Sequence, residues 1–332
     1  MSESMINPIA ERFGIKISRK KKIRGGIYRI VTSKGKTFSL KRMPKRVGRL
    51  KWIDRILLRI QRNGSLVAWR NPNTPEGRKP YATSRKGEHY VLTPWISGRK
   101  PSPRSLSDMR RCGVALARFH KAGHAGIKGK IAYSRIGSWY SALRHREGYI
   151  KHKIVKARRN AFSLSNSRFI KQHGSEILRY SNRAKALLQG SGYYQYRRNP
   201  RKFGILCHGD GGPSNFIINS KGTYLIDFET VHVDLRAYDL YRVIYNSCKD
   251  YKWNFSIASA ILDGYRQVSK LHKNDFKLLR ALLRFPYTTY LVLSPFKRLP
   301  FTKRRLQWAL ESERKIGPFL KKLDEYAAKN CS

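Results

Sequence analysis

Apolar and polar residues alternate along residues 36–42, where Phe38 and Leu40 are apolar and Lys41 lies on the polar face. A period of two is the pattern of a strand with one buried side. A second apolar segment, 27–32, comes just before it across a short turn that contains a glycine. These segments predict a β-hairpin whose polar face could serve a ligand cleft.

The segments that follow show helical spacing instead. Apolar residues recur every three or four positions over 45–63, and Asn63-Gly64 forms a stop signal. The same spacing predicts a helix over 108–121, which Ser105 or Ser107 can cap. Three more amphipathic helices are predicted in the C-terminal part, over 253–270, 275–285 and 302–329.

The remaining N-terminal segments carry weaker patterns. Residues 1–20 predict a short helix that leads into a basic, solvated run at 19–22. The segment 69–87 is rich in proline, glycine and arginine and predicts loops, followed by a strand at 89–93. These elements give a small β-containing region ahead of a larger helical one.

The net charge of the chain is unusual, whereas its hydrophobic content is ordinary for a globular protein. The 332 residues include 71 Lys and Arg against 20 Asp and Glu, a net charge of +51, with 40% hydrophobic residues. That apolar content suffices for one or two domains. The positive excess is densest over 144–202 and predicts a polyanionic neighbour. Non-specific nucleic-acid binding is one such interpretation, although no nucleic-acid module is visible.

The sequence contains no pattern for a membrane span or for a cysteine-based site. No apolar run approaches the ~18 residues of a transmembrane helix, and the first residues lack a signal-peptide pattern, so cytoplasmic synthesis is expected. The four cysteines include no C-x-x-C pair, and buried thiols are the expectation. Cys331, next to the C-terminus, could be exposed.

Residues 206–228, LCHGDGGPSNFIINSKGTYLIDF, have a spacing that points to chemistry. Asn215 follows Asp210 by five positions, and two short strands around a glycine-containing turn then lead to Asp227. The hairpin returns the chain beside Asn215. Two carboxylates and a carboxamide are therefore expected to converge.

Phosphoryl transfer from a nucleotide needs this set of groups. One carboxylate must lie beside the attacking hydroxyl, and oxygen ligands must hold Mg²⁺ against the phosphates. Asp210 fits the first role, and Asn215 and Asp227 fit the second. The alternative to a catalytic role is that Asp210 and Asp227 are loop aspartates that only cap turns. His208 is expected to bond loop backbone and not to move protons.

The motifs 208–210 (HGD) and 227–229 (DFE) resemble the catalytic-loop and metal-loop motifs of kinases. The glycine form is similar to that of the aminoglycoside and choline phosphotransferase superfamily, and more narrowly to CotS-type spore coat proteins of endospore-forming bacteria. The metal loop leads directly into residues 230–240, without a long activation segment. This brevity favours a small-molecule pocket. By the same resemblance Asp239 would brace the catalytic loop.

The resemblance implies an α+β, bilobal protein-kinase-like fold. A small β-rich N-lobe would occupy residues 1–96 and a larger, mainly helical C-lobe residues 97–332. The catalytic loop would lie at 206–216 and the metal loop at 225–229.

The resemblance also implies which residues would bind the nucleotide. Lys41 resembles the strand lysine that kinases place on the α- and β-phosphates. Residues 90–98 resemble the hinge, so the Pro94 carbonyl and the Ile96 amide would face adenine. Proline loses nothing in that position, because only its carbonyl is required.

The helical glutamate of the superfamily is missing from residues 45–63. Asp54 is the only acid there, and it lies on the apolar stripe of the predicted helix. One interpretation is that Asp54 binds Lys41 inside the nucleotide cleft and replaces the glutamate. The other is a helix-edge carboxylate screened by Lys51 and Arg55.

Two functional hypotheses follow from these assignments. The first is a Mg²⁺-dependent phosphotransferase that uses ATP or another nucleoside triphosphate. Its acceptor would be a hydroxyl of an unidentified small molecule or coat-associated compound. Asp210 would be its base, and Lys41 would hold phosphate. The second is a non-enzymatic, basic spore coat protein that binds polyanions on a kinase-like scaffold. For both, the resemblance to spore coat proteins implies synthesis in the cytoplasm of the mother cell during sporulation and a place in the spore coat.

Overall fold

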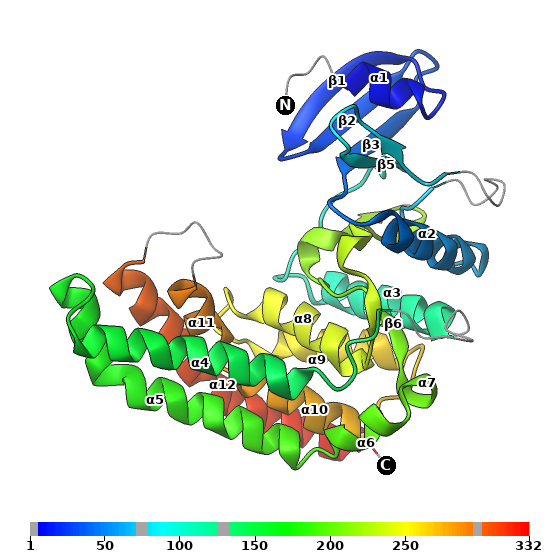
Figure 1. Cartoon of the computed structure of the whole chain (residues 1–332). Coiled ribbons are helices and arrows are strands. Elements are labelled where there is room, and N and C mark those ends of the chain that lie inside the picture. Colours follow the sequence, from blue (N-terminus) through cyan, green and yellow to red (C-terminus); the bar gives the residue numbers. More distant parts are fainter. Residues whose placement is uncertain (1–5, 71–78, 125–132, 295–300, 332) are drawn as a thin grey trace.

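The strand-forming segments near the N-terminus build one antiparallel sheet (Figure 1). The computed structural model describes residues 6–70, 79–124, 133–294 and 301–331. The sheet has the order β1-β2-β3-β5-β4. Its strands are β1 (Ile17–Arg24), β2 (Ile27–Thr32), β3 (Thr37–Arg42), β4 (Ala82–Thr83) and β5 (His89–Pro94). The predicted hairpin is confirmed by β2 and β3, where Tyr28 faces Leu40.

The basic run at 19–22 belongs to β1, which sequence analysis did not predict as a strand. Its side chains are exposed or only partly buried, so it lacks the alternation that marks a half-buried strand. Charged residues on such an edge strand discourage pairing with other chains. The short helix α1 (Ile6–Glu11) packs Ile6 and Ile9 into a small core with Tyr28.

The helix α2 (Val47–Arg62) follows the sheet and confirms the helix expected at 45–63. Its buried residues, among them Leu50 and Leu57, join the core of the helical part and not the small core above the sheet. Figure 1 shows α2 between the sheet and α3 (Leu106–His124). It therefore connects the two parts of the molecule.

Helices dominate the rest of the chain (Figure 1). After α3 come α4 (Trp139–Arg158), α5 (Leu164–Gln189), α6 (Tyr193–Arg198), α7 (Pro200–Phe203), α8 (Arg236–Cys248), α9 (Phe255–Arg266), α10 (Lys273–Arg284), α11 (Tyr287–Leu293) and α12 (Lys303–Asn330). The helices predicted at 108–121 and near the C-terminus are confirmed. Ser105 caps α3, because its hydroxyl accepts from the Asp108 amide at 3.2 Å.

The helices α3 and α9 cross at a contact that requires glycine. A Cβ at Gly113 would lie 2.1 Å from the Ile261 carbonyl oxygen, and a Cβ at Gly264 would lie 2.0 Å from the Arg110 carbonyl oxygen. Neither backbone can move away cheaply, because each belongs to a packed helix. This contact fixes α3, which carries His120 toward the catalytic loop.

Two short strand pairs lie within the helical part. The strands β6 (Ile205–Cys207) and β9 (His232–Asp234) pair around the catalytic loop, and β7 (Phe216–Asn219) and β8 (Gly222–Leu225) form the predicted hairpin. The mixed α+β architecture predicted from the sequence is confirmed. The lobe boundary at residue 96 stays a prediction.

No helix in the described part of the chain is long and apolar enough to cross a membrane. All four cysteines are buried. The expectation that Cys331 could be exposed is wrong, because its thiol lies 3.3 Å from the Leu271 carbonyl oxygen beneath the end of α12.

Candidate active site

The catalytic loop is held by a buried carboxylate, Asp239, in the first turn of α8. Its oxygens accept from the His208 amide at 2.6 Å and the Gly209 amide at 2.8 Å. His120 contacts it at 3.0 Å. Burial raises the pKa of Asp239, but these bonds and the nearby histidines outweigh burial and leave it below its usual value. The predicted bracing role of Asp239 is confirmed.

His208 joins the catalytic loop to the metal loop. Its Nε2 lies 2.8 Å from the Ile226 carbonyl oxygen, and its Nδ1 accepts from the Asp210 amide at 3.3 Å. Both ring nitrogens are thus used by backbone, as the sequence predicted. Gly209 has φ +85°, and a Cβ there would lie 2.5 Å from the Thr230 carbonyl oxygen. The loop therefore needs glycine between its histidine and its aspartate.

Asp210 and Asn215 occupy the two ends of this loop. The Asn215 side-chain amide donates to the Asp210 carbonyl at 2.7 Å, which leaves its Oδ1 as the atom able to bind a cation. The Asp210 side chain is 47% exposed and accepts from Arg242 Nη2 at 2.6 Å. One carboxylate oxygen of the candidate base is therefore held by an arginine from α8.

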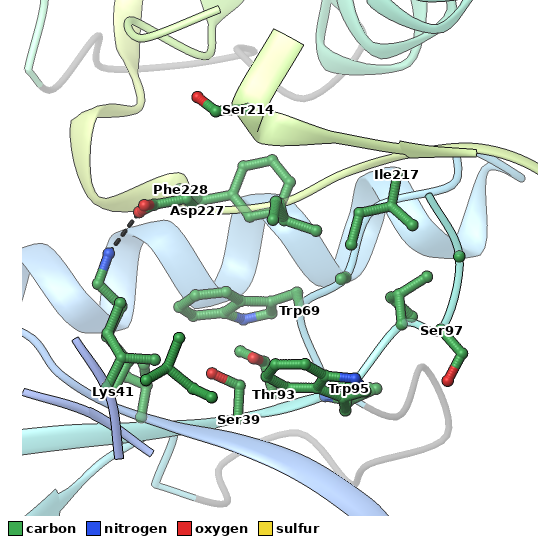
Figure 2. A pocket seen from close by; sticks show the side chains of 18 of the residues that line it. Ser39, Lys41, Trp69, Thr93, Trp95, Ser97, Ser214, Ile217, Asp227 and Phe228 are labelled. Carbon is green, nitrogen blue, oxygen red and sulfur yellow. Dashed lines mark hydrogen bonds and ion pairs between the residues drawn. The ribbon is translucent and has the colours of Figure 1, made fainter. Parts of the chain in front are cut away.

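Asp227 follows β8 and reaches the candidate phosphate lysine. The backbone of Asp227 has φ +69°, a left-handed conformation that is uncommon outside glycine and typical of sites under functional constraint. Asp227 contacts Lys41 (Figure 2). Arg24 Nη2 lies 3.6 Å from an Asp227 carboxylate oxygen. The Ile226 amide donates to the Asn215 carbonyl at 3.0 Å, so the metal loop lies beside the catalytic loop. The structure therefore brings Lys41, Asp227 and Asn215 into one region.

Asp54 does not pair with Lys41, and this interpretation of the sequence is wrong. Its oxygens accept from the Trp69 indole at 2.9 Å and from Arg70 at 2.6 Å, whereas Lys41 contacts Asp227 and, at 3.0 Å, Glu229. The partners of Asp54 follow α2 closely in the chain and fold back onto it. The alternative of a solvated helix edge is wrong too, since only 7% of Asp54 is exposed. Burial raises its pKa, against the hydrogen bonds from Trp69 and Arg70.

A cavity of about 440 Å³ lies between the sheet and the β7–β8 hairpin. Its lining is mostly apolar and includes Trp69 and Phe228, whose rings meet edge to face at 6.4 Å. Figure 2 shows Lys41 on one side of the cavity and Trp95 with Ser97 on the other. Ligand sites of this kind combine apolar walls with a few polar groups, and this volume suits a nucleotide base and sugar.

The predicted hinge forms one wall of this cavity. The Trp95 amide donates to the Thr37 carbonyl at 3.1 Å. The Pro94 carbonyl belongs to the same trans peptide group as this amide and points the opposite way, so it is directed away from β3. Pro94 and Ile96 both line the cavity. Their role toward adenine stays a prediction.

Several residues of this site were missed by sequence analysis. Lys100 donates to the Ser214 carbonyl at 2.6 Å and lines the cavity. Burial and the nearby Arg24 lower the pKa of Lys100, while Asp227 acts in the opposite direction. Glu229 was noticed only as a replacement for the usual glycine. In a chain with 71 Lys and Arg, no sequence signal separates Arg24, Lys100 or Arg242 from the rest.

The comparisons with known proteins agree with this geometry. A model described as the phosphotransferase enzyme family matches residues 26–271. A structure of an aminoglycoside phosphotransferase from Alicyclobacillus acidocaldarius has a TM-score of 0.81 at 20% identity, covering 99% of this chain and 98% of the other. This likeness shows the fold, and the predicted protein-kinase-like class is confirmed. No curated protein matches the chain.

Two further structures are similar at lower scores. An amicoumacin kinase with AMP-PNP and Ca²⁺ has a TM-score of 0.56 at 14% identity, with 98% of this chain and 94% of the other covered. A spectinomycin phosphotransferase with ADP and spectinomycin has a TM-score of 0.57 at 13% identity, with 94% and 95% covered. Both support the same fold over nearly the whole chain.

Proposed function

The chain belongs to the phosphotransferase enzyme family, and from that premise we propose that it transfers the γ-phosphoryl group of ATP, with Mg²⁺, to a hydroxyl group of a small molecule. The observation that carries this proposal is the meeting of Lys41, from the sheet, with Asp227, from the metal loop, at the cavity. Structurally similar proteins hold AMP-PNP with Ca²⁺ or ADP. Those complexes support a nucleotide and a divalent cation here.

The donor set fits a hard cation. The carboxylate of Asp227 and the Oδ1 of Asn215 are the oxygen ligands that Mg²⁺ prefers, and few protein ligands suffice because this ion keeps most of its waters. When bound, Mg²⁺ would neutralise charge on the transferred phosphoryl group. In the structure Lys41 and Arg24 balance Asp227. With a cation on Asp227, both side chains become available to phosphate oxygens.

The remaining residues supply orientation and base chemistry. Pro94 and Ile96 would hold the adenine edge through backbone groups. Asp210 would accept the proton of the acceptor hydroxyl, and its position is fixed by the loop that Asp239 and His208 brace. A positioned base of this kind contributes roughly 10²–10⁴ in rate.

A thermal-shift titration with ATP tests this function. The unfolding temperature of the wild-type protein should rise with ATP in the presence of Mg²⁺, because a ligand at 100 times its Kd stabilises the folded state by about 2.7 kcal/mol. Asp227→Ala should lose the Mg²⁺-dependent part of this rise. Equal stabilisation of both proteins would refute the assignment of the metal ligand.

A second candidate, a non-catalytic polyanion-binding role in a spore coat, is favoured by the net charge of +51. A nucleotide cleft needs only a few cations, so most of this charge lies outside the chemistry. Counterion release predicts that binding to DNA, to an acidic glycan and to isolated spore coat material falls steeply as salt rises. Salt-insensitive binding to one of these partners would favour a specific site, and the absence of binding at low salt would refute this role.

A further inference from the structure

The surface beside Asp210 combines arginine and tyrosine side chains. Arg242, bonded to Asp210, has its guanidinium carbon 5.9 Å from the centre of the Tyr287 ring. Arg146, from α4, lies over the same ring at 5.2 Å and over the Tyr290 ring at 5.9 Å. Guanidinium groups from two helices therefore converge on one tyrosine next to the candidate base.

These two arginines have little negative charge to balance them. Among the described residues, Arg242 has one ion-pair partner, Asp210, and its buried Nε has no hydrogen-bond partner. Within that same part of the chain, Arg146 makes its contacts to aromatic rings and forms no ion pair. Stacking on tyrosine holds the guanidinium planes in place without neutralising them.

A third arginine, Arg135, adds to the positive field. The phenol of Tyr238 lies close enough to all three arginines for their charges to lower its pKa, although burial is stronger and leaves that pKa raised. Other carboxylates nearby are buried and already bonded. Asp234 accepts from the Trp139 indole at 3.0 Å, and Glu313 accepts from the Thr288 amide at 2.9 Å. Glu147, next to Arg146, is paired with Lys151 and Lys185. Asp210 is therefore the carboxylate that this surface presents to an acceptor.

Building on the proposed function, we propose that the acceptor is a hydroxylated small molecule that also carries an anionic group, a phosphate or a carboxylate, which Arg146 and Arg242 bind beside Asp210. A guanidinium presents paired N–H donors that match the oxygens of either anion. The partly buried rings of Tyr287 and Tyr290 border the same surface, and their exposed parts can pack against the carbon skeleton.

The same surface disfavours a polycation. An aminoglycoside carries several ammonium groups at neutral pH, and each would approach guanidinium groups of like charge, which costs free energy unless a carboxylate intervenes. The structural likeness to aminoglycoside and spectinomycin phosphotransferases therefore does not extend to the kind of acceptor bound.

In this arrangement, binding of the acceptor also releases the Asp210 carboxylate from Arg242. The anionic group competes with Asp210 for Arg242, which frees the carboxylate oxygen that Arg242 occupies. The hydroxyl proton then passes to Asp210, the hydroxyl oxygen forms a bond to the γ-phosphorus, and the bond from that phosphorus to the β–γ bridging oxygen breaks. ADP leaves with that oxygen, and the phosphorylated acceptor remains.

Calorimetric titration with four probes tests this inference. Glucose 6-phosphate and gluconate carry the anion, glucose lacks it, and kanamycin is a polycation. Each is titrated into the full-length protein with and without Mg²⁺ and AMP-PNP. Glucose 6-phosphate or gluconate should bind at least about tenfold more tightly than glucose or kanamycin, as expected for a charge-assisted hydrogen-bonded pair.

Four variants separate a site from the general positive charge. Arg146→Ala and Arg242→Ala should each remove most of the preference for the anionic probe. Arg118→Ala removes one exposed arginine from α3 and should leave the preference unchanged. Arg242→Lys keeps the charge but not the paired donors, and its affinity should be intermediate, which a folding defect in Arg242→Ala would not reproduce.

Three outcomes would overturn the inference: equal affinity for glucose and both anionic probes, tighter binding of kanamycin, or equal losses in Arg118→Ala and Arg146→Ala. Failure of the proposed function is recognised separately. In that case AMP-PNP with Mg²⁺ would not bind, while the anionic probes would still bind with the predicted dependence on Arg146.

Discussion

The nucleotide side and the acceptor side of this site balance their charges differently. On the nucleotide side, Lys41 faces both Asp227 and Glu229, and the cavity wall is largely apolar. On the acceptor side, the arginines outnumber the carboxylate that is available, and tyrosines separate them. The first arrangement suits a phosphate chain that arrives with a metal ion. The second suits an anion that arrives without one.

This difference shows which features depend on the fold and which on individual side chains. The lysine, the metal-loop aspartate and the hinge come from backbone elements that the family model covers. The acceptor side depends on individual side chains: Arg146 from α4, Arg242 from α8, and Tyr287 and Tyr290 from α11. We therefore expect substitutions on the two sides to separate nucleotide binding from acceptor binding.

The largest effect is expected from Asp210→Asn. It should lower the rate of transfer by about 10²–10⁴ once an acceptor is in hand, since it removes the base, while ATP binding remains close to wild type. The measurement is ADP release with and without acceptor, beside an ATP titration. Unchanged transfer would place the base elsewhere.

Asn215→Ala should weaken the apparent affinity for Mg²⁺ by roughly 10- to 100-fold in the presence of ATP, because it removes an oxygen ligand. Asn219→Ala, at the end of β7 in the same hairpin, is the matched control for folding. The Mg²⁺ concentration that gives half of the maximal thermal shift is the quantity to compare. Similar values for the two variants would remove Asn215 from the metal site.

Asp54→Ala tests whether Asp54 stabilises the fold through Trp69 and Arg70 or acts together with Lys41. It removes the buried carboxylate that accepts from the Trp69 indole and from Arg70 Nη2, so the free energy of unfolding should fall by about 1–3 kcal/mol. Lys41→Ala should weaken ATP binding instead. In the double variant the losses in ATP affinity should add, because the two side chains bind different partners. If Asp54→Ala by itself weakened ATP binding as much as Lys41→Ala does, and the double variant were no weaker than either, the Lys41–Asp54 pair would be restored.

A further effect concerns pH and lies away from the site. Glu313 is fully buried, accepts from the Thr288 amide at 2.9 Å and faces Arg284, and burial raises its pKa to about 8. A raised folded-state pKa favours the protonated form, so its stabilising effect is present below about 4.5 and is lost as pH rises toward 8.

The comparison of two glutamine variants isolates this effect. Between pH 5 and 8.5 the unfolding temperature of the wild type should fall relative to that of Glu313→Gln. Glu311→Gln, exposed on the same helix, should behave as wild type. Parallel pH profiles for all three proteins would contradict the role of Glu313.

The sequence predicted the parts of this site that are fixed by local spacing. Asp210, Asn215 and Asp227 lie within one short segment, so their convergence follows from a single hairpin. The contacts of Asp54 and Arg242 could not be predicted in this way. Asp54 is bound by residues whose loop folds back onto α2, and Arg242 reaches Asp210 from a helix that begins after another strand. β1 was missed because an edge strand need not alternate.

A structure with AMP-PNP and Mg²⁺ tests the central claim most directly. The account predicts adenine against the Pro94 carbonyl and the Ile96 amide, the metal ion on Asn215 and Asp227, and Lys41 moved from Asp227 onto phosphate. Asp210 and Arg242 should remain free of nucleotide contacts. A nucleotide bound outside this cavity, or a metal ion that does not touch Asp227, would contradict the account.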